Sequence, residues 1–149
     1  MDISYDYKDL FKTLNRRRVK YLVVGAYAVI FYSEPRFTKD LDIWVKPDVK
    51  NAAKVYKALK EFGAPLRDIT IGDFTNKRLF FQMGIAPVRV DIIMGLGNID
   101  FDFAWKKKKK SQYAGITINV IGLKELKKSK LISKRPQDLL DLEKLNRIN

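Results

Sequence analysis

Two aspartates separated by one residue are the side chains of this sequence best suited to metal chemistry. Asp40 and Asp42 stand at the start of the stretch 40–45, whose apolar alternation predicts a strand. Side chains two positions apart on a strand project from the same face, so both carboxylates can approach the same divalent cations. Hard carboxylate oxygens in a site that also receives phosphate oxygens suit Mg²⁺.

The stretch before this pair gives it a context that a lone Asp-x-Asp lacks. The apolar run Tyr21–Val24 predicts a buried strand that ends at Gly25, and residues 25–32 predict a helix that follows at once. Free backbone N–H groups at the start of that helix form a candidate phosphate site, and glycine allows an anion to approach closely. Acid-x-acid spacing recurs twice further along the chain, but without this context.

Asp91 is the candidate for a third metal-binding carboxylate. It lies within the apolar run 88–94, which predicts another strand. A carboxylate in such a strand is costly unless it is paired or metal-bound. The alternative is a salt bridge to Arg89 or to another basic side chain.

Composition excludes several kinds of chemistry. The 149 residues include no cysteine and no histidine, so disulfides, thiolate metal sites, imidazole bases and Ser-His-Asp triads are ruled out. The net charge of +13 favours polyanionic partners such as nucleotides or nucleic acid, although a compositional bias would give the same charge. The polar N-terminus and the lack of a long apolar run lead us to expect a cytoplasmic protein without a membrane partner.

Hydrophobic periodicity predicts a mixed α+β fold with a short mixed β-sheet flanked by helices. Without a repeat or linker, we expect a single domain over 1–149, with an N-terminal helix (1–19), a sheet-and-helix body (20–121) and C-terminal helices (122–149). Besides the segments above, the pattern predicts helices over 6–18, 47–62, 101–110, 122–129 and 136–148, strands over 79–83 and 116–121, and an irregular segment over 69–76.

The order of these motifs resembles the nucleotidyltransferase superfamily of DNA polymerase beta and kanamycin nucleotidyltransferase. The likeness is greatest to the AbiEii-type proteins of toxin–antitoxin systems. The family pattern of an apolar strand, a Gly-Gly or Gly-Ser pair, Asp-x-Asp and a later lone aspartate falls on Gly25-Ala26, Asp40-Leu41-Asp42 and Asp91. Arg36-Phe37-Thr38 matches the Arg-x-Thr of the AbiEii-type branch.

The resemblance continues to the C-terminal end and covers roughly residues 20–145. Lys130 followed by Arg135-Pro136-Gln137-Asp138 and a further aspartate is similar to a string near the end of that branch. One departure is Ala26, which stands where the family has glycine or serine and offers no hydroxyl to a phosphate.

The resemblance implies transfer of an NMP from an NTP to a tRNA-like RNA or to a protein. It implies two Mg²⁺ ions about 3.5–4 Å apart. The implied metal ligands are Asp40, Asp42 and Asp91, and the implied phosphate contacts come from Gly25, Ala26, Arg36, Thr38 and Lys130. Asp138 would position either Lys130 or the base. The oligomeric state stays open.

Each of these roles has a plainer alternative. Lys130 could be a solvated lysine, Asp138 could favour the start of a helix, and Lys106–Lys110 could be a solvated helix end rather than an RNA contact. Trp44 and Trp105 are expected in the core. A binding protein with a decayed site, or a domain with no nucleotide role, would keep the same fold.

Overall fold

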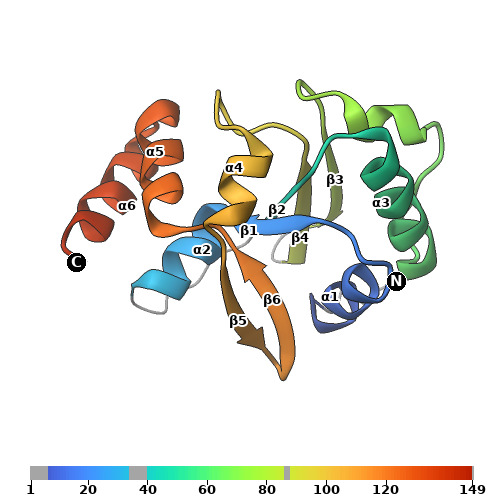
Figure 1. Cartoon of the computed structure of the whole chain (residues 1–149), viewed down its shortest axis with the longest axis horizontal. Coiled ribbons are helices and arrows are strands. Elements are labelled where there is room, and N and C mark those ends of the chain that lie inside the picture. Colours follow the sequence, from blue (N-terminus) through green and yellow to red (C-terminus); the bar gives the residue numbers. More distant parts are fainter. Residues whose placement is uncertain (1–6, 34–39, 86–87, 149) are drawn as a thin grey trace.

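We describe the protein from a computed structural model, which places residues 7–33, 40–85 and 88–148 (Figure 1). Six α-helices, one 3₁₀ helix and six strands occur within these ranges. In chain order they are α1 (Tyr7–Arg16), β1 (Tyr21–Val24), α2 (Gly25–Tyr32), β2 (Asp40–Val45), α3 (Val49–Phe62), η1 (Ile71–Thr75), β3 (Phe80–Ile85), β4 (Val88–Ile93), α4 (Phe101–Lys106), β5 (Lys109–Tyr113), β6 (Ile116–Val120), α5 (Leu123–Ser133) and α6 (Pro136–Asn146).

The strands form one sheet in the order β3-β4-β2-β1-β6-β5. β2 runs parallel to β4 and β1 runs parallel to β6, whereas the other neighbours are antiparallel. The predicted mixed sheet flanked by helices is confirmed. Because β2 lies between β1 and β4, the start of α2 and the carboxylates of β2 and β4 meet near the middle of the sheet.

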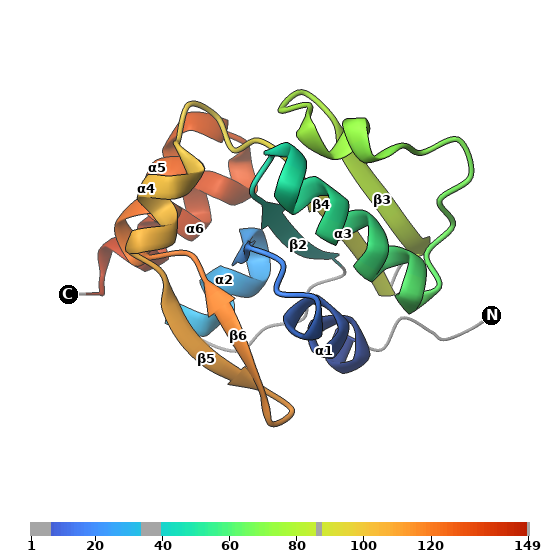
Figure 2. The same ribbon diagram turned by 45° about the vertical axis from the view of Figure 1, so that its right-hand side comes forward.

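The helices form two groups around this sheet (Figure 2). α1 packs against α3 and β6, and α3 also contacts η1. α2 contacts β1 and β2 and touches both C-terminal helices, α5 and α6, which pack on each other. Figure 1 shows α5 and α6 at the opposite end of the molecule from α3. The C-terminal helices are therefore brought to the beginning of α2, far away in sequence.

α1 contributes one apolar face to the core, because its apolar side chains recur at helical spacing. Leu10, Phe11 and Leu14 are buried on one face of α1, as the periodicity predicts. Phe11 stacks on Tyr21 of β1 with ring centroids 6.0 Å apart. Burial of such side chains stabilises the fold by roughly 1.5–3 kcal/mol each. This packing fixes β1, and with it the glycine that follows.

The prediction of a helix over 101–110 is wrong in its second half. α4 ends at Lys106, and Lys109–Tyr113 form β5, an edge strand paired with β6. Lys109 and Lys110, the last two lysines of the run, lie on a sheet edge, where charged side chains discourage pairing with another chain. Pairing with β6 outweighs the helix propensity of lysine, because tertiary context overrides such local preferences. No helix in the described ranges is both long and apolar enough to cross a membrane.

Candidate active site

Asp42 and Asp91 lie side by side on neighbouring strands, and we call them the aspartate pair. β2 and β4 are paired in a register that places Asp42 opposite Asp91, so the two carboxyl groups are neighbours. Gln82 on β3 lies opposite Asp91 and donates its side-chain amide to Asp91 Oδ1 over 3.1 Å. Three adjacent strands thus hold these groups on one face of the sheet.

Electrostatics within the aspartate pair disfavour two negative charges. Burial, together with the negative charges of Asp91 and Asp40, raises the pKa of Asp42 to about 7, although Lys130 opposes the rise. Like-charged carboxylates in contact do not both ionise readily without a cation. The pair therefore holds a proton near neutral pH or accepts a positive ion in its place.

Asp40 points to a different partner. The register places Asp40 opposite Arg89, and Arg89 Nη2 lies 2.8 Å from Asp40 Oδ2. Arg89 Nε is 3.9 Å from Asp91 Oδ1, so its closer carboxylate is that of Asp40. Within the described ranges, no three acidic side chains are grouped closely enough to hold a metal ion. Of the three expected carboxylates, two therefore form the aspartate pair. The third, Asp40, forms an ion pair with the arginine on the neighbouring strand instead.

Gly25 brings the start of α2 against Asp42. Its φ of +65° is a left-handed conformation that favours glycine. A Cβ atom on Gly25 would lie 2.2 Å from Asp42 Oδ2, so the carboxylate occupies the space that a side chain would need. Val24, the N-cap of α2, makes no side-chain capping bond, and the first turn carries no acidic residue. The first-turn N–H groups, including that of Ala26, form an electropositive end beside Asp42.

Lys130 is buried between two aspartates, and we call Lys130, Asp138 and Asp141 the lysine cluster. Its Nζ lies 3.0 Å from Asp138 Oδ1 and 3.2 Å from Asp141 Oδ2. All three side chains are at most 7% exposed. Lys130 is therefore not a solvated lysine, and Asp138 contacts Lys130 as expected. Asp141 completes the cluster.

Asp138 is held ionised by several donors. Burial by itself would raise its pKa, but hydrogen bonds from Arg135, Ser133 and Lys130 outweigh burial and hold the pKa at about 2. Arg135 Nε donates to Asp138 Oδ2 over 2.8 Å, and the Ser133 hydroxyl donates to the same oxygen. Asp138 also lies in the first turn of α6, where an acidic side chain favours a helix start, so it serves both the helix and the cluster.

One cavity of about 750 Å³ brings these groups together. Its lining includes every described residue of the predicted site, together with Arg89, Ser129, Ser133, Arg135, Pro136, Gln137 and Asp141. A volume in this range accommodates a nucleotide. The uncapped beginnings of α2 and α6 both border the cavity. Arg36 and Thr38, two predicted phosphate contacts, lie outside the described residues.

Solved structures provide the comparison for this arrangement. A candidate nucleotidyltransferase from Thermotoga maritima is 18% identical, with a TM-score of 0.61, over 95% of this chain and 90% of that one. The chain has the nucleotidyltransferase fold. The chain matches no protein-family model and no curated protein sequence.

Two further proteins have the nucleotidyltransferase fold in common with this chain. A lincosamide antibiotic adenylyltransferase, LnuA, with lincomycin bound, is 15% identical with a TM-score of 0.54, over 97% of this chain and 98% of that one. An antigenic nucleotidyltransferase-like protein from Paracoccidioides brasiliensis is also 15% identical, with a TM-score of 0.59, over 91% of this chain and 71% of that one. At 15–18% sequence identity the likeness establishes only the fold, so a conclusion about activity has to rest on the residues of the site.

Three contributors to the site were missed from the sequence. Gln82 was not selected because strand alternation leaves several positions that could lie opposite Asp91, and only the hairpin register decides among them. Arg135 and Asp141 belonged to a motif string, but no role was assigned to them. Their spacing from Asp138, three residues in each direction, places all three near one side of a helix start and could have indicated the cluster.

Proposed function

We propose that this protein is a Mg²⁺-dependent nucleotidyltransferase that moves an NMP from an NTP to an acceptor hydroxyl. The observation that carries the proposal is the juxtaposition of the aspartate pair with the start of α2, where Asp42 occupies the space next to Gly25. A cation held by the carboxylates would then face phosphates held by backbone N–H groups.

The aspartate pair suits a hard divalent cation. Asp42 and Asp91 offer adjacent carboxylate oxygens whose mutual repulsion a cation would relieve. Asp40 is the third candidate ligand, and it would have to turn from Arg89 toward the pair. When bound, Mg²⁺ would stabilise negative charge on the phosphate oxygens and increase the acidity of the attacking hydroxyl.

The other side of the cavity suits a triphosphate. The beginning of α2 presents backbone N–H groups, and that of α6 presents those of the residues after Pro136, which has none itself. Arg135 adds an exposed guanidinium. Among the described residues, Lys130 contacts the carboxylates of Asp138 and Asp141, which uses two of its three N–H donors. The third donor is left for a phosphate oxygen. Asp138 and Asp141 hold Lys130 in place, so it loses little side-chain entropy on binding.

The reaction is an in-line displacement at the α-phosphorus. The acceptor oxygen forms a bond to phosphorus, and the bond between phosphorus and the pyrophosphate oxygen breaks. Gln82 donates to Oδ1 of Asp91, which leaves the other carboxylate oxygen of Asp91 to accept the proton of the acceptor hydroxyl. Pyrophosphate leaves past Lys130 and Arg135, which neutralise part of its charge.

RNA is the acceptor class that the charge of the protein favours. The net charge of +13 draws a polyanion to the surface through counterion release. A tRNA-like acceptor and a place in a toxin–antitoxin system of the AbiEii type belong to this proposal, on the motif likeness given above. A protein acceptor is the alternative within the same chemistry.

A binding protein with a decayed site is the second candidate function. Ala26 favours it, because a serine hydroxyl at this position could hold a phosphate and alanine has none. The ion pair between Asp40 and Arg89 also favours it, since it neutralises one expected ligand. The intact aspartate pair argues against it.

Label transfer tests the proposal directly. The purified protein is incubated with Mg²⁺, each α-labelled NTP in turn, and either total RNA or a cell lysate. We expect label on RNA with the wild type and none with Asp42→Asn. Label on protein would change the acceptor class. If no acceptor is labelled and Mg²⁺–NTP does not bind, the decayed-site function replaces the proposal.

A further inference from the structure

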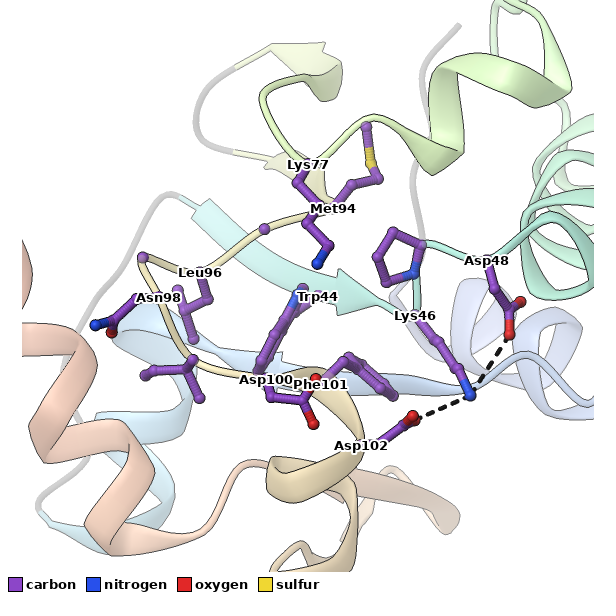
Figure 3. Close-up of a pocket in the computed structure, with 14 residues that line it drawn as sticks. Trp44, Lys46, Asp48, Lys77, Met94, Leu96, Asn98, Asp100, Phe101 and Asp102 are labelled. Atoms are coloured by element: carbon purple, nitrogen blue, oxygen red, sulfur yellow. Dashed lines mark ion pairs between the residues drawn. The ribbon is translucent and has the colours of Figure 1, made fainter.

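A second cavity lies beyond the aspartates on β2 and has no part in the proposed transfer step. Its volume is about 420 Å³. Figure 3 shows that it lies between the end of β2, the segment Met94–Asp102 and Lys77. A volume of this size accommodates a small ligand. None of the residues predicted from the sequence as site residues lines it.

Trp44 supplies a polar group that the protein itself leaves unused. The side chain is 1% exposed, and its ring packs edge-on against Phe101 with centroids 5.0 Å apart. The indole nitrogen is buried and has no hydrogen-bond partner among the described residues. Buried donors are nearly always paired, and an unmade bond costs roughly 1–3 kcal/mol. In Figure 3 the ring is drawn with its nitrogen toward Lys77.

The mouth of this cavity offers both donors and acceptors. Lys77 brings an exposed ammonium group that forms no ion pair with the described part of the chain. Lys46 Nζ lies 2.9 Å from Asp102 Oδ1 and 3.4 Å from Asp48 Oδ2, so carboxylates line the same opening. Met94 adds an apolar wall. A flat heterocycle with a ring carbonyl, an exocyclic amino group and an attached phosphate matches this set of groups.

The two cavities adjoin each other. Leu96 lines both. Trp44 follows Asp42 by two residues on the same side of β2, which is roughly 7 Å along a strand. A nucleoside whose sugar hydroxyl lies at Asp42 and Asp91 can therefore reach Trp44 with its base.

We propose that this second cavity binds the base of the acceptor nucleotide of an RNA. Trp44 donates its indole N–H to a carbonyl oxygen of the base, and Lys77 contacts the phosphate of the same nucleotide. The opening by which the base enters is bordered by Lys46, Asp48 and Asp102. This assignment rests on the proposed function for the identity of the acceptor, whereas the binding that it asserts can be measured without any transfer.

The test is a titration of the ¹⁵N-labelled protein with each ribonucleoside 5′-monophosphate, followed by NMR. The chain has two tryptophans, so two indole signals are expected, and Trp44→Phe identifies that of Trp44. We expect the Trp44 indole signal to shift with at least one monophosphate, and Lys77→Gln to weaken that binding about 3- to 10-fold. Lys57→Gln, an exposed lysine on α3, is the matched control and should leave binding unchanged.

The outcomes separate this inference from the proposed function. A Trp44 signal that stays still while the Gly25 amide shifts would place the monophosphate in the first cavity only and overturn the inference. A shift that Lys77→Gln does not weaken would overturn it as well. If the Trp44 signal shifts as expected but no RNA is labelled in the transfer assay, base binding stands and the proposed transfer fails.

Discussion

The aspartate pair and the lysine cluster border the same cavity but are in opposite electrostatic states. Asp42 and Asp91 face each other with too little positive charge nearby, and the pKa of Asp42 is raised to about 7 by burial and by its acidic neighbours. Asp138 is buried as well, yet donors from Arg135, Ser133 and Lys130 hold its pKa at about 2. Burial favours a higher pKa for both carboxyl groups, so the difference between their pKa values comes from the neighbouring side chains.

This contrast assigns different work to the two groups. A carboxylate whose charge is already matched is a structural element, since its removal leaves a buried cation without a partner. A carboxylate pair whose charge is unmatched is poised to bind a cation, because ionisation becomes favourable only when the cation arrives. The four predictions below would either break this division or make it sharper.

Lys130→Met should give the largest effect on folding. It removes the cation from the buried carboxylates of Asp138 and Asp141, and we expect the free energy of unfolding at pH 8 to fall by about 3–5 kcal/mol. Urea denaturation measures this change. Lys128→Met, at an exposed position on the same helix, is the control and should change it by less than about 0.5 kcal/mol. Equal effects of the two substitutions would remove the structural role of the lysine cluster.

Asp42→Asn should abolish transfer without weakening the fold. Loss of an outer-shell partner of a metal typically costs 10- to 100-fold in activity, so a direct ligand should cost at least about 100-fold. Without Mg²⁺ at pH 8, the variant should unfold at the same temperature as the wild type or higher, because the repulsion with Asp91 is gone. Label transfer and thermal unfolding, run on the same preparation, check both parts. A clearly lower unfolding temperature would show that Asp42 is structural too.

The pH dependence of stability should reveal the aspartate pair. The folded pKa of Asp42, about 7, exceeds its ordinary value of 3.8, so the folded state binds more protons between these values. The stabilisation of the folded state by this proton is complete below pH 4 and is lost as the pH rises through 7. Mg²⁺ at ten times its dissociation constant should restore about 1.4 kcal/mol at pH 8 and less at pH 5.

Thermal unfolding at both pH values, with and without Mg²⁺, measures this linkage. The comparison is between the wild type and Asp42→Asn, because other groups titrate in both proteins and cancel in the difference. In a chain of this size, each change of 1 kcal/mol in the free energy of unfolding should shift the unfolding temperature by about 2–4 °C. If Mg²⁺ raised the unfolding temperature of both proteins equally, the ion would be binding elsewhere.

Ala26→Ser should have the smallest effect and concerns the phosphate side of the cavity. A hydroxyl at the start of α2 would add one hydrogen bond to a phosphate oxygen, so NTP should bind about 3- to 10-fold more tightly. Equilibrium binding of NTP in Mg²⁺ gives the ratio, and Ala53→Ser on α3 serves as control. Weaker binding by Ala26→Ser would mean that the start of α2 does not receive the phosphates.

The local elements near the site were predictable because their signals are short-range. Tyr21–Val24 as a strand and Gly25–Tyr32 as a helix are confirmed at those bounds, and apolar periodicity together with one glycine accounts for both. Lys109–Tyr113 was mistaken for helix because its strand character depends on pairing with β6, which comes later in the chain.

The sequence by itself determined the mixed fold, the placement of Asp40 and Asp42 on one face of a strand, and the glycine that begins α2. These follow from backbone periodicity and from the conformational freedom of a single residue. Only the tertiary structure decided that Asp42 meets Asp91 while Asp40 meets Arg89, since strand register is set by the packing of the whole sheet. It also decided that Lys130 is buried between Asp138 and Asp141, because the packing of α5 on α6 removes these charges from water.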